Sequence, residues 1–303
     1  MIQLTKFFID TGKEEITVMG IVVGIDIGGS TTKIAGFDGE AMLKSVQISA
    51  DNAIASLFGA FGKFLYDNRL SLEDIEQVNL TGVGASAVDQ AIYGLPTYKV
   101  DEFSANGVGG GYFAQGKKEF MVVSMGTGTS FVSVKNGVPT HLGGIGIGGG
   151  TIIGLSKLML NTSDIDKIQE LAQGGQVGHI DLRIGDISAK PLPGLNLEIT
   201  ASNFGKASSR ATCEDKAAGI VHMVIESICQ TAALIAQGTD MRDFVLIGAL
   251  TNFPECEVVC GMIKTMYPDL NFIVPKDGEY GTAIGTALAE KCCLRYIGGE
   301  AAK

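Results

Sequence analysis

The sequence predicts an α/β protein with two related lobes that face each other. Residues 21–37 read IVVGIDIGGSTTKIAGF, and residues 120–134 read FMVVSMGTGTSFVSV. Each stretch is an apolar β-rich run, a turn of glycine and hydroxyl residues, and a second β-rich run, a pattern typical of a β-hairpin. Because the pattern recurs about a hundred residues later, we expect two copies of one architecture. The first lobe is placed at residues 21–118 and the second at residues 119–303.

Helical and strand patterns alternate along both lobes. Residues 52–67 place apolar side chains at helical spacing, and residues 78–83 read as a strand that ends in a glycine turn. Further helices are expected at 86–93, 104–116, 151–160, 164–173, 216–237, 258–266 and 282–290, further strands at 98–100, 244–247 and 271–274, and a loop-rich segment at 175–199. Such alternation favours the α/β class.

The composition argues against several classes of protein. Apolar residues make up 46% of the 303 residues, so the chain can bury a large core. The 23 basic and 33 acidic residues give a net charge of −10 without any Lys/Arg cluster, which makes nucleic acids and anionic membranes poor partners. No uninterrupted apolar run reaches the ~18 residues of a membrane-spanning helix.

Residues 1–20 lack the pattern of a secretion signal, because acidic residues stand where its apolar segment would be. This N-terminal extension is either an added strand and turn or poorly ordered. The six cysteines are expected to be reduced thiols in a cytoplasmic protein. They are Cys213, Cys229, Cys256, Cys260, Cys292 and Cys293. Their spacing, without a nearby His, does not favour a metal or iron–sulfur site.

The first hairpin carries a candidate phosphate site. The turn and its flanks supply Asp26, Gly28, Gly29, Ser30, Thr31, Thr32 and Lys33. The two glycines lack Cβ atoms, so phosphate oxygens could reach backbone N–H groups, while the hydroxyls and the lysine add donors. The aspartate ends a buried strand, where Mg²⁺ would offset the cost of an unpaired carboxylate. Considered alone, this hairpin is explained equally well as an ordinary glycine turn.

The second hairpin repeats the same chemistry. Its turn supplies Gly126, Thr127, Gly128 and Thr129. Two such turns in one chain are much less expected by chance than one. Facing each other, they would hold a nucleotide polyphosphate from both sides.

A third glycine-rich segment, GGIGIGGGT at residues 143–151, runs directly into an expected helix. The start of a helix has free N–H groups and the positive end of the helix dipole. Glycines at that position are typical of an anion site. A mobile connector is the alternative interpretation.

Together these elements resemble the superfamily of acetate and sugar kinases, Hsp70 and actin. The resemblance covers nearly the whole chain from about residue 21. It implies an actin-like (ribonuclease H-like) ATPase fold, with ATP bound in a cleft between the two lobes by paired glycine hairpins.

Four further segments narrow the resemblance to the type II pantothenate kinases. They are DEF at 101–103, PLPGLNLEITASNFG at 191–205, the glycine-rich segment at 143–151, and GEYGTAIGTAL at 278–288. The resemblance implies ATP- and Mg²⁺-dependent phosphorylation of pantothenate to 4′-phosphopantothenate, the first step of coenzyme A synthesis. It also implies a cytoplasmic homodimer, for which the apolar helix at 216–237 is a candidate interface.

The resemblance assigns the role of general base to Glu102, which directly follows a first-lobe strand. The chemistry agrees, because a primary alcohol is a poor nucleophile until a base takes its proton during phosphoryl transfer. Asp101 is the adjacent competitor, and a surface acid is the alternative to both.

Other roles follow from position in the resemblance. Gly149, Gly150, Thr151, Ile152 and Ile153 would meet the nucleotide, Gly248 and Ala249 would lie near the adenosine, and Thr200 near the substrate, across a dimer interface. One position departs from the family pattern: His141 stands where the family usually has a substrate-holding Arg. A neutral His offers one donor where Arg offers a fixed fork, so His141 is a candidate substrate residue with altered chemistry.

The sequence is also compatible with three alternative functions. The acceptor could be a sugar, although the Asn-Asp or Gly-His-Asp context of sugar kinases is missing from the sequence. The chain could activate a radical dehydratase through an iron–sulfur cluster, with Cys256 and Cys260 as its only candidate ligands. It could also be a non-catalytic nucleotide sensor, in view of His141.

Overall fold

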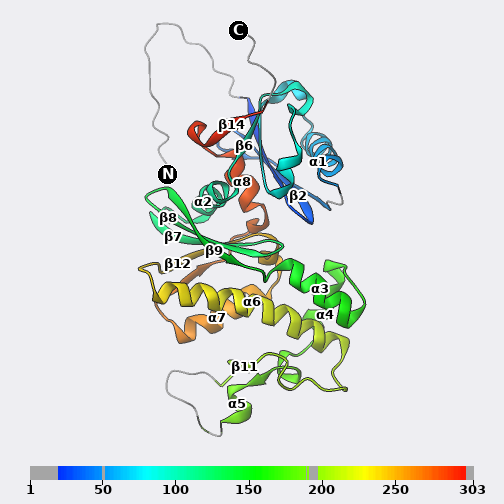
Figure 1. The fold of residues 1–303 in the computed structure, drawn as a ribbon, viewed down its shortest axis with the longest axis vertical. Helices are drawn as coiled ribbons and strands as arrows, with labels where there is room; N and C mark the ends of the chain where they lie inside the picture. Colours follow the sequence, from blue (N-terminus) through cyan, green and yellow to red (C-terminus); the bar gives the residue numbers. More distant parts are fainter. Residues whose placement is uncertain (1–19, 50–51, 189, 191–196, 298–303) are drawn as a thin grey trace.

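The computed structural model of this protein describes residues 20–49, 52–188, 190 and 197–297 (Figure 1). Residues 1–19, which make up nearly all of the expected N-terminal extension, lie outside the described residues. Residues 191–196 of the segment at 191–205 also lie outside them.

The first lobe is built on a seven-stranded sheet in the order β14-β6-β5-β1-β2-β3, with β4 also paired to β2. β1 and β2 form the first expected hairpin and pair antiparallel, while β5 and β6 continue the sheet parallel to β1. The strands are β1 Ile21–Ile27, β2 Thr31–Asp38, β3 Ala41–Met42, β4 Val46–Ser49, β5 Ile75–Thr81, β6 Thr97–Val100 and β14 Leu294–Tyr296.

The second lobe repeats this arrangement in a five-stranded sheet of order β13-β12-β7-β8-β9. β7 and β8 form the second expected hairpin, and β12 and β13 lie parallel on its other side. The strands are β7 Glu119–Met125, β8 Thr129–Lys135, β9 Val138–Ile145, β12 Asp243–Ile247 and β13 Asn271–Ile273, and a separate ribbon pairs β10 Leu182–Arg183 with β11 Thr200–Ser202. The shared order confirms the internal repeat that the two hairpins predicted.

Helices cover both sheets (Figure 1). α1 packs the buried residues Leu57, Phe61 and Phe64 against the first sheet. In the second lobe, α6 and its neighbours pack a large apolar cluster against β7 and β12. The helices are α1 Ala53–Asn68, α2 Glu102–Phe113, α3 Gly149–Leu160, α4 Ile165–Gly174, α5 Ile184–Ile187, α6 Cys213–Gln237, α7 Glu255–Met266 and α8 Gly281–Ala287.

Helix α6 is the longest helix in the described part of the chain, and the residue before it, Thr212, fixes where it starts. Thr212 accepts a hydrogen bond from the Asp215 N–H at 3.1 Å, a side-chain cap of the kind that Thr favours. Among the described residues, α6 is the one helix long and apolar enough to cross a membrane, but 61% of its apolar stretch is buried inside the protein. It has the position of a core helix.

Helices α2 and α8 cross between the two sheets at a very short separation (Figure 1). A Cβ atom added to Gly285 would overlap the carbonyl oxygen of Ala105, and one added to Gly109 would overlap that of Gly281. The crossing therefore requires glycine on both helices, because no flexible side chain can move aside. This contact joins the two lobes.

We expect Gly285→Ala to lower the free energy of unfolding by about 1–3 kcal/mol, the usual effect of overpacking a tight contact. The measurement is the midpoint of thermal and urea unfolding. Gly261→Ala is the matched control, because Gly261 is exposed on α7 and a Cβ there meets nothing within 4 Å. The control should gain about 0.4–1 kcal/mol. Equal stability of the two variants would contradict the close crossing.

The expected elements differ from the structure in several places. Residues 86–93 hold the end of one 3₁₀ turn, Val83–Ala87, and the start of another, Ile92–Gly94, instead of a helix. The helix is interrupted because Val88 and Ala91, between the two turns, have extended backbone conformations. No strand was expected at β9, Val138–Ile145, whose last residues overlap the glycine-rich segment at 143–151. The end of the chain also returns to the first sheet, where β14 pairs antiparallel with β6. The lobe boundary at residues 118 and 119 stays a prediction.

Candidate active site

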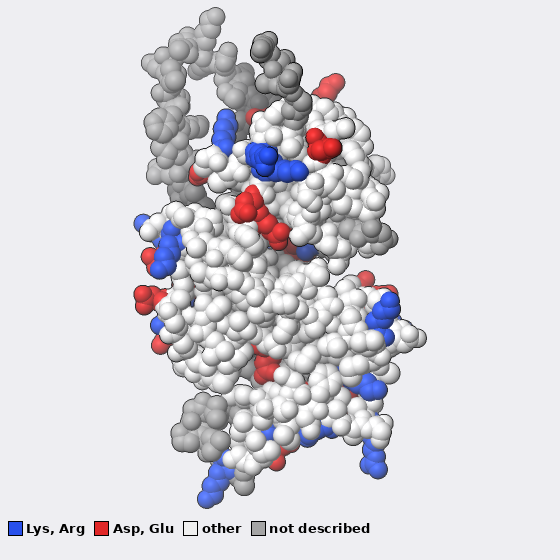
Figure 2. Space-filling model, in the orientation of Figure 1, with Lys and Arg blue, Asp and Glu red and all other residues white. Residues whose placement is uncertain are grey.

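A cleft of about 750 Å³ lies between the lobes and brings most of the predicted site residues together. Both glycine turns line it, together with Glu102 and the end of β12. In Figure 2 the outline of the molecule narrows between its upper and lower parts, and Lys and Arg are scattered over this face. The predicted residues that line the cleft are Asp26, Gly28, Gly29, Ser30, Thr31, Lys33, Glu102, Gly126, Thr127, Gly128, Thr129, Gly149, Gly150, Ile153, Gly248 and Ala249.

The two glycine turns face each other across this cleft. The first is closed by a hydrogen bond from Gly28 N–H to the Thr31 carbonyl oxygen at 3.0 Å. The Ser30 and Thr127 hydroxyl oxygens, one from each turn, lie 3.5 Å apart. Hydroxyls and glycine backbone from both lobes therefore meet at one place, as polyphosphate binding from two sides requires.

Asp26 and Lys33 lie opposite each other on β1 and β2, at the base of the cleft. Burial raises the pKa of the Asp26 carboxyl, and the charge of Lys33 offsets this only in part. Burial likewise lowers the pKa of Lys33, against the attraction of Asp26 and Glu279. Within the described residues, no hydrogen bond or ion pair reaches the Asp26 carboxylate.

A magnesium ion fits this carboxylate. Mg²⁺ takes oxygen ligands and usually keeps several waters, binding through one or two carboxylates and the phosphates of a substrate. The described part of the chain has no group of three or more His, Cys, Asp or Glu that could hold a metal ion. A metal at Asp26 would therefore take most of its ligands from phosphate and water.

Gly82 holds the backbone close to Asp26. It follows β5, has φ of +87°, and a Cβ there would lie 2.6 Å from Asp26 Oδ1. Any larger residue would both strain the backbone and displace the carboxylate. Sequence reasoning missed this residue, although it lies at the carboxyl end of a parallel strand, where ligands usually bind in α/β sheets.

Glu102 owes its position to the end of β6 and the start of α2. Asp101 caps the helix by accepting a hydrogen bond from the Ser104 N–H at 2.9 Å. Glu102 is then the first helical residue and projects into the cleft. Burial raises the pKa of its carboxyl, and the nearby charges of Asp26 and Asp101 raise it further.

The start of α3 differs from the predicted anion site. Gly149 N–H donates to the Gly126 carbonyl oxygen at 2.8 Å, and Gly150 N–H donates to that of Thr127 at 2.9 Å. These donors are therefore not free to bind phosphate. The glycines serve close packing instead, because a Cβ on Gly148 would lie 2.6 Å from the Thr127 carbonyl oxygen.

Three predicted residues, Thr32, Thr151 and Ile152, are not part of the cleft lining. Thr32 is buried and shares a hydrogen bond of 2.8 Å with the Ser56 hydroxyl of α1, because alternate residues of β2 point to opposite faces. Ile152 is buried in the core of the second lobe. The Thr151 hydroxyl accepts a hydrogen bond of 3.2 Å from the Gly148 N–H and so closes the first turn of α3.

His141 and Thr200 also lie outside the cleft lining. His141, on β9, stacks its ring on Phe103 with the ring centres 3.7 Å apart, so it lies beside the residue that follows Glu102. Thr200, on β11, lies on the opposite side of α6 from the second sheet (Figure 1). Its hydroxyl is 3.2 Å from His222 Nε2.

Several lining residues come from elements that sequence reasoning did not connect with the site. Gln47 lies on β4, and Thr282, on α8, donates a hydrogen bond of 2.8 Å to the buried Asn106 of α2. Leu250 and Phe253 form an apolar wall beside Ala249. The pattern of polar residues within apolar helices was the one available signal for Asn106 and Thr282.

The two candidate cysteine ligands are poorly placed to hold an iron–sulfur cluster. Cys256 and Cys260 are buried within the core of the second lobe, with 0% and 8% of their surface exposed. Cys260 Sγ lies 4.0 Å from Cys229 Sγ. An iron–sulfur cluster could not bind these two thiols without disrupting this core, which argues against the dehydratase-activator hypothesis.

Comparisons with known proteins agree with this architecture. A family model described as Fumble matches residues 117–255. The chain is 30% identical to a type II pantothenate kinase of Bacillus cereus (strain G9842) over 284 residues, which cover 88% of this chain and 97% of the relative. It is also 30% identical over 281 residues to that of Bacillus anthracis, covering 89% and 98%.

Two solved structures show the same fold. The activator of the 2-hydroxyisocaproyl-CoA dehydratase from Clostridium difficile, with bound ADPNP, superimposes with a TM-score of 0.65 at 19% identity, over 88% of this chain and 93% of that chain. A ROK family glucokinase from Streptomyces griseus gives a TM-score of 0.57 at 13% identity, over 88% and 98%. At such identities the likeness shows the actin-like ATPase fold alone. The full-length relatives show more: this chain belongs to the type II pantothenate kinase family.

Proposed function

We propose that this protein transfers the γ-phosphoryl group of ATP to the 4′-hydroxyl of pantothenate, in the cytoplasm, as a homodimer. Family membership supports the reaction. The observation that carries it is the shared cleft, in which the carboxylate of Glu102 and the two glycine turns line one space. A base and a polyphosphate site must be adjacent if an alcohol is to attack a γ-phosphate.

In this proposal the turns at 28–31 and 126–129 hold the phosphates through backbone N–H groups and hydroxyls. Lys33 contributes positive charge at the base of the cleft. The apolar wall of Leu250 and Phe253 accommodates the adenosine. Asp26 would hold Mg²⁺, directly or through water, and the ion would neutralise charge that develops on the transferring phosphoryl group.

Glu102 acts as the general base. Its carboxylate accepts the proton of the 4′-hydroxyl as the hydroxyl oxygen bonds to the γ-phosphorus, and the bond from that phosphorus to the ADP oxygen breaks. A carboxylate whose pKa is raised toward the working pH is better suited to this role than an ordinary surface acid.

The acceptor lies at the Glu102 end of the cleft in this proposal. Phe103 and His141, which stack beside Glu102, would border it. Thr200 lies on the side of α6 that is remote from the second sheet, so it does not line the cleft of its own chain. It would contact pantothenate in the cleft of the second copy.

The test is ADP release by the purified protein with Mg-ATP and pantothenate, beside a panel of hexoses and N-acetyl amino sugars. Turnover with pantothenate is the expected result. Turnover with a sugar alone would replace the acceptor while keeping the ATP site. ATP binding without turnover of any acceptor would overturn the kinase assignment in favour of a nucleotide sensor.

The pKa of Glu102 predicts the pH dependence of this reaction. The base is active when deprotonated, so kcat/KM should fall as the pH drops through a pKa that lies above that of an ordinary glutamate. Asp101→Asn removes one of the charges that raise this pKa, so its acid limb should move to lower pH. High salt should shift the wild-type limb in the same direction, because it screens the same repulsion. An Asp101→Asn profile that coincides with wild type would contradict this account.

A further inference from the structure

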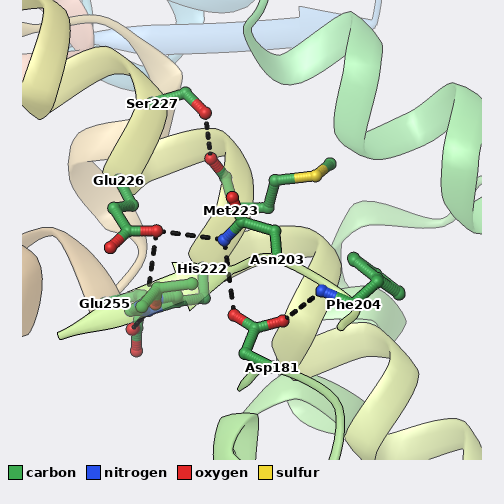
Figure 3. A network of polar contacts seen from close by, with 9 residues as sticks. Asp181, Asn203, Phe204, His222, Met223, Glu226, Ser227 and Glu255 are labelled. Carbon is green, nitrogen blue, oxygen red and sulfur yellow. Dashed lines mark hydrogen bonds and ion pairs between the residues drawn. The ribbon is translucent and has the colours of Figure 1, made fainter. Parts of the chain in front are cut away.

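A polar network that joins β11 to α6 and the start of α7 lies outside the cleft lining (Figure 3). At its centre is His222, in the middle of α6, with 3% of its surface exposed. Its Nδ1 lies 2.6 Å from Glu255 Oε1 at the start of α7, and its Nε2 lies 3.2 Å from the Thr200 hydroxyl of β11.

Three carboxylates surround this single imidazole. Glu226, one turn further along α6, has Oε2 3.7 Å from His222 Nε2. Glu255 faces it from α7, and the fully buried Asp181 faces it from the turn before β10. Within the described part of the chain, these three carboxylates are the charges that act on His222.

The rest of the network anchors the segment that carries Thr200. Asn203 donates a hydrogen bond to Glu226 Oε2 at 3.0 Å, and the Phe204 N–H donates to Asp181 Oδ1 at 2.7 Å (Figure 3). β11 and the turn that follows it are therefore fixed to α6 through these carboxylates. The side chain of Thr200 is held at the edge of this anchored segment, half-buried.

The charges favour the protonated ring. Burial alone would lower the pKa of His222, but the hydrogen bond to Glu255 and the charges of Glu226, Glu255 and Asp181 together raise it. Buried carboxylates are stable only when they are paired with positive charge or hydrogen bonds. The imidazolium therefore persists to a higher pH than in an ordinary histidine, and the ring becomes neutral as the pH rises through this raised pKa.

Protonation decides which way the Thr200 hydroxyl donates. An ionised carboxylate only accepts, so Nδ1 must carry a proton toward Glu255 in both states of the ring. In the imidazolium, Nε2–H donates to the Thr200 oxygen, and the hydroxyl proton is free to point outward. In the neutral ring, Nε2 can only accept, so the hydroxyl donates inward and presents lone pairs outward.

We propose that His222 sets the hydrogen-bonding polarity of Thr200 and thereby the preference of the enzyme for an anionic acceptor. With His222 protonated, Thr200 offers a donor to the carboxylate of pantothenate, in the cleft of the second copy. With His222 neutral, it offers lone pairs that repel the carboxylate. This inference rests on the proposed function, and His222 is in this sense a positioning residue.

The test compares pantothenate with its alcohol analogue, in which CH₂OH replaces the carboxylate. The ratio of kcat/KM for the two acceptors is measured against pH at saturating Mg-ATP. Titration of Glu102 and of ATP affects both acceptors and cancels in this ratio. We expect the ratio to fall about tenfold as the pH rises through the pKa of His222, the effect of losing a hydrogen bond to a charged group.

Two variants test the contact between Thr200 and His222. Thr200→Val removes the hydroxyl, and it should give a low ratio that does not change with pH. His222→Gln places a non-titrating amide near Nε2, and it should also remove the pH dependence. His179→Gln is the matched control, because His179 pairs with Asp215 at the start of α6. This control should keep the wild-type profile.

A direct measurement remains decisive if His222→Gln fails to fold. The chain has three histidines, so ¹⁵N-histidine labelling gives three imidazole rings to assign. We expect His222 to lose its Nε2 proton, with Nδ1 still protonated, over the pH range in which the ratio falls. Three results would overturn this inference and leave the proposed function standing. They are a ratio that does not change with pH, a Thr200→Val enzyme with the wild-type pH profile, and a His222 ring that stays in one protonation state over this range. No turnover of pantothenate at any pH would overturn the proposed function and this inference with it.

Discussion

Glu102→Gln is expected to lower kcat for pantothenate by about 10²–10⁴-fold, the usual contribution of one well-placed general base. Glutamine keeps the size of the side chain and cannot accept the proton of the 4′-hydroxyl. Because Glu102 lines the cleft without forming a hydrogen bond that holds the fold in the described residues, the KM for ATP should change little. Steady-state ADP release and a direct ATP-binding measurement separate these two quantities.

Asp101→Asn is the matched control for this experiment. Asp101 precedes Glu102, caps α2 and is exposed, so its amide analogue removes one neighbouring charge and leaves the base in place. At a pH above the acid limb, its kcat should stay close to wild type. A similar loss in both variants, or a Glu102→Gln enzyme that keeps most of its kcat, would assign the proton to another group.

Asp26→Asn is expected to lower the affinity for Mg²⁺, or the activity at a fixed Mg²⁺ concentration, by about 10–100-fold. The same substitution should leave stability unchanged or raise it. Burial already raises the pKa of this carboxyl, which means that the charged form of Asp26 destabilises the folded protein. Activity and stability should therefore move in opposite directions.

The two measurements are a Mg²⁺ titration of kcat and the midpoint of thermal unfolding. A residue that served only the structure would lose stability and activity together. A normal Mg²⁺ titration in Asp26→Asn would show that the ion, if required, is held by other groups. Asp67→Asn offers a comparison at an acid on α1, which pairs with Lys63 at 2.8 Å and lies outside the cleft lining.

The hairpins were predictable from the sequence because a hairpin is a local structure. Two strands and a glycine turn lie within about twenty residues, so their pattern is visible without tertiary information. Recurrence of the pattern then predicted the second sheet, which repeats the strand order of the first. Glu102 could be located because it follows a strand directly, and resemblance to a family assigned its role.

The rest of the site depends on contacts between distant segments. Gln47, Gly82 and Thr282 reach the cleft from β4, the end of β5 and α8, and no local pattern relates these positions. The start of α3 has the sequence of an anion site, yet its N–H groups at Gly149 and Gly150 are taken by carbonyl groups of the second hairpin. Composition shows which donors exist, and only the fold shows which are already used.

The return of the chain to its first sheet has a consequence for the order in which the protein is completed during synthesis. β13 ends at Ile273, so all five strands of the second sheet are present once that residue has left the ribosome. The first sheet still lacks β14 at that point, and Ala35 and Phe37 still lack the buried residues of α8. Nascent domains usually fold from the N-terminus onward. Here the half that is made first is completed last.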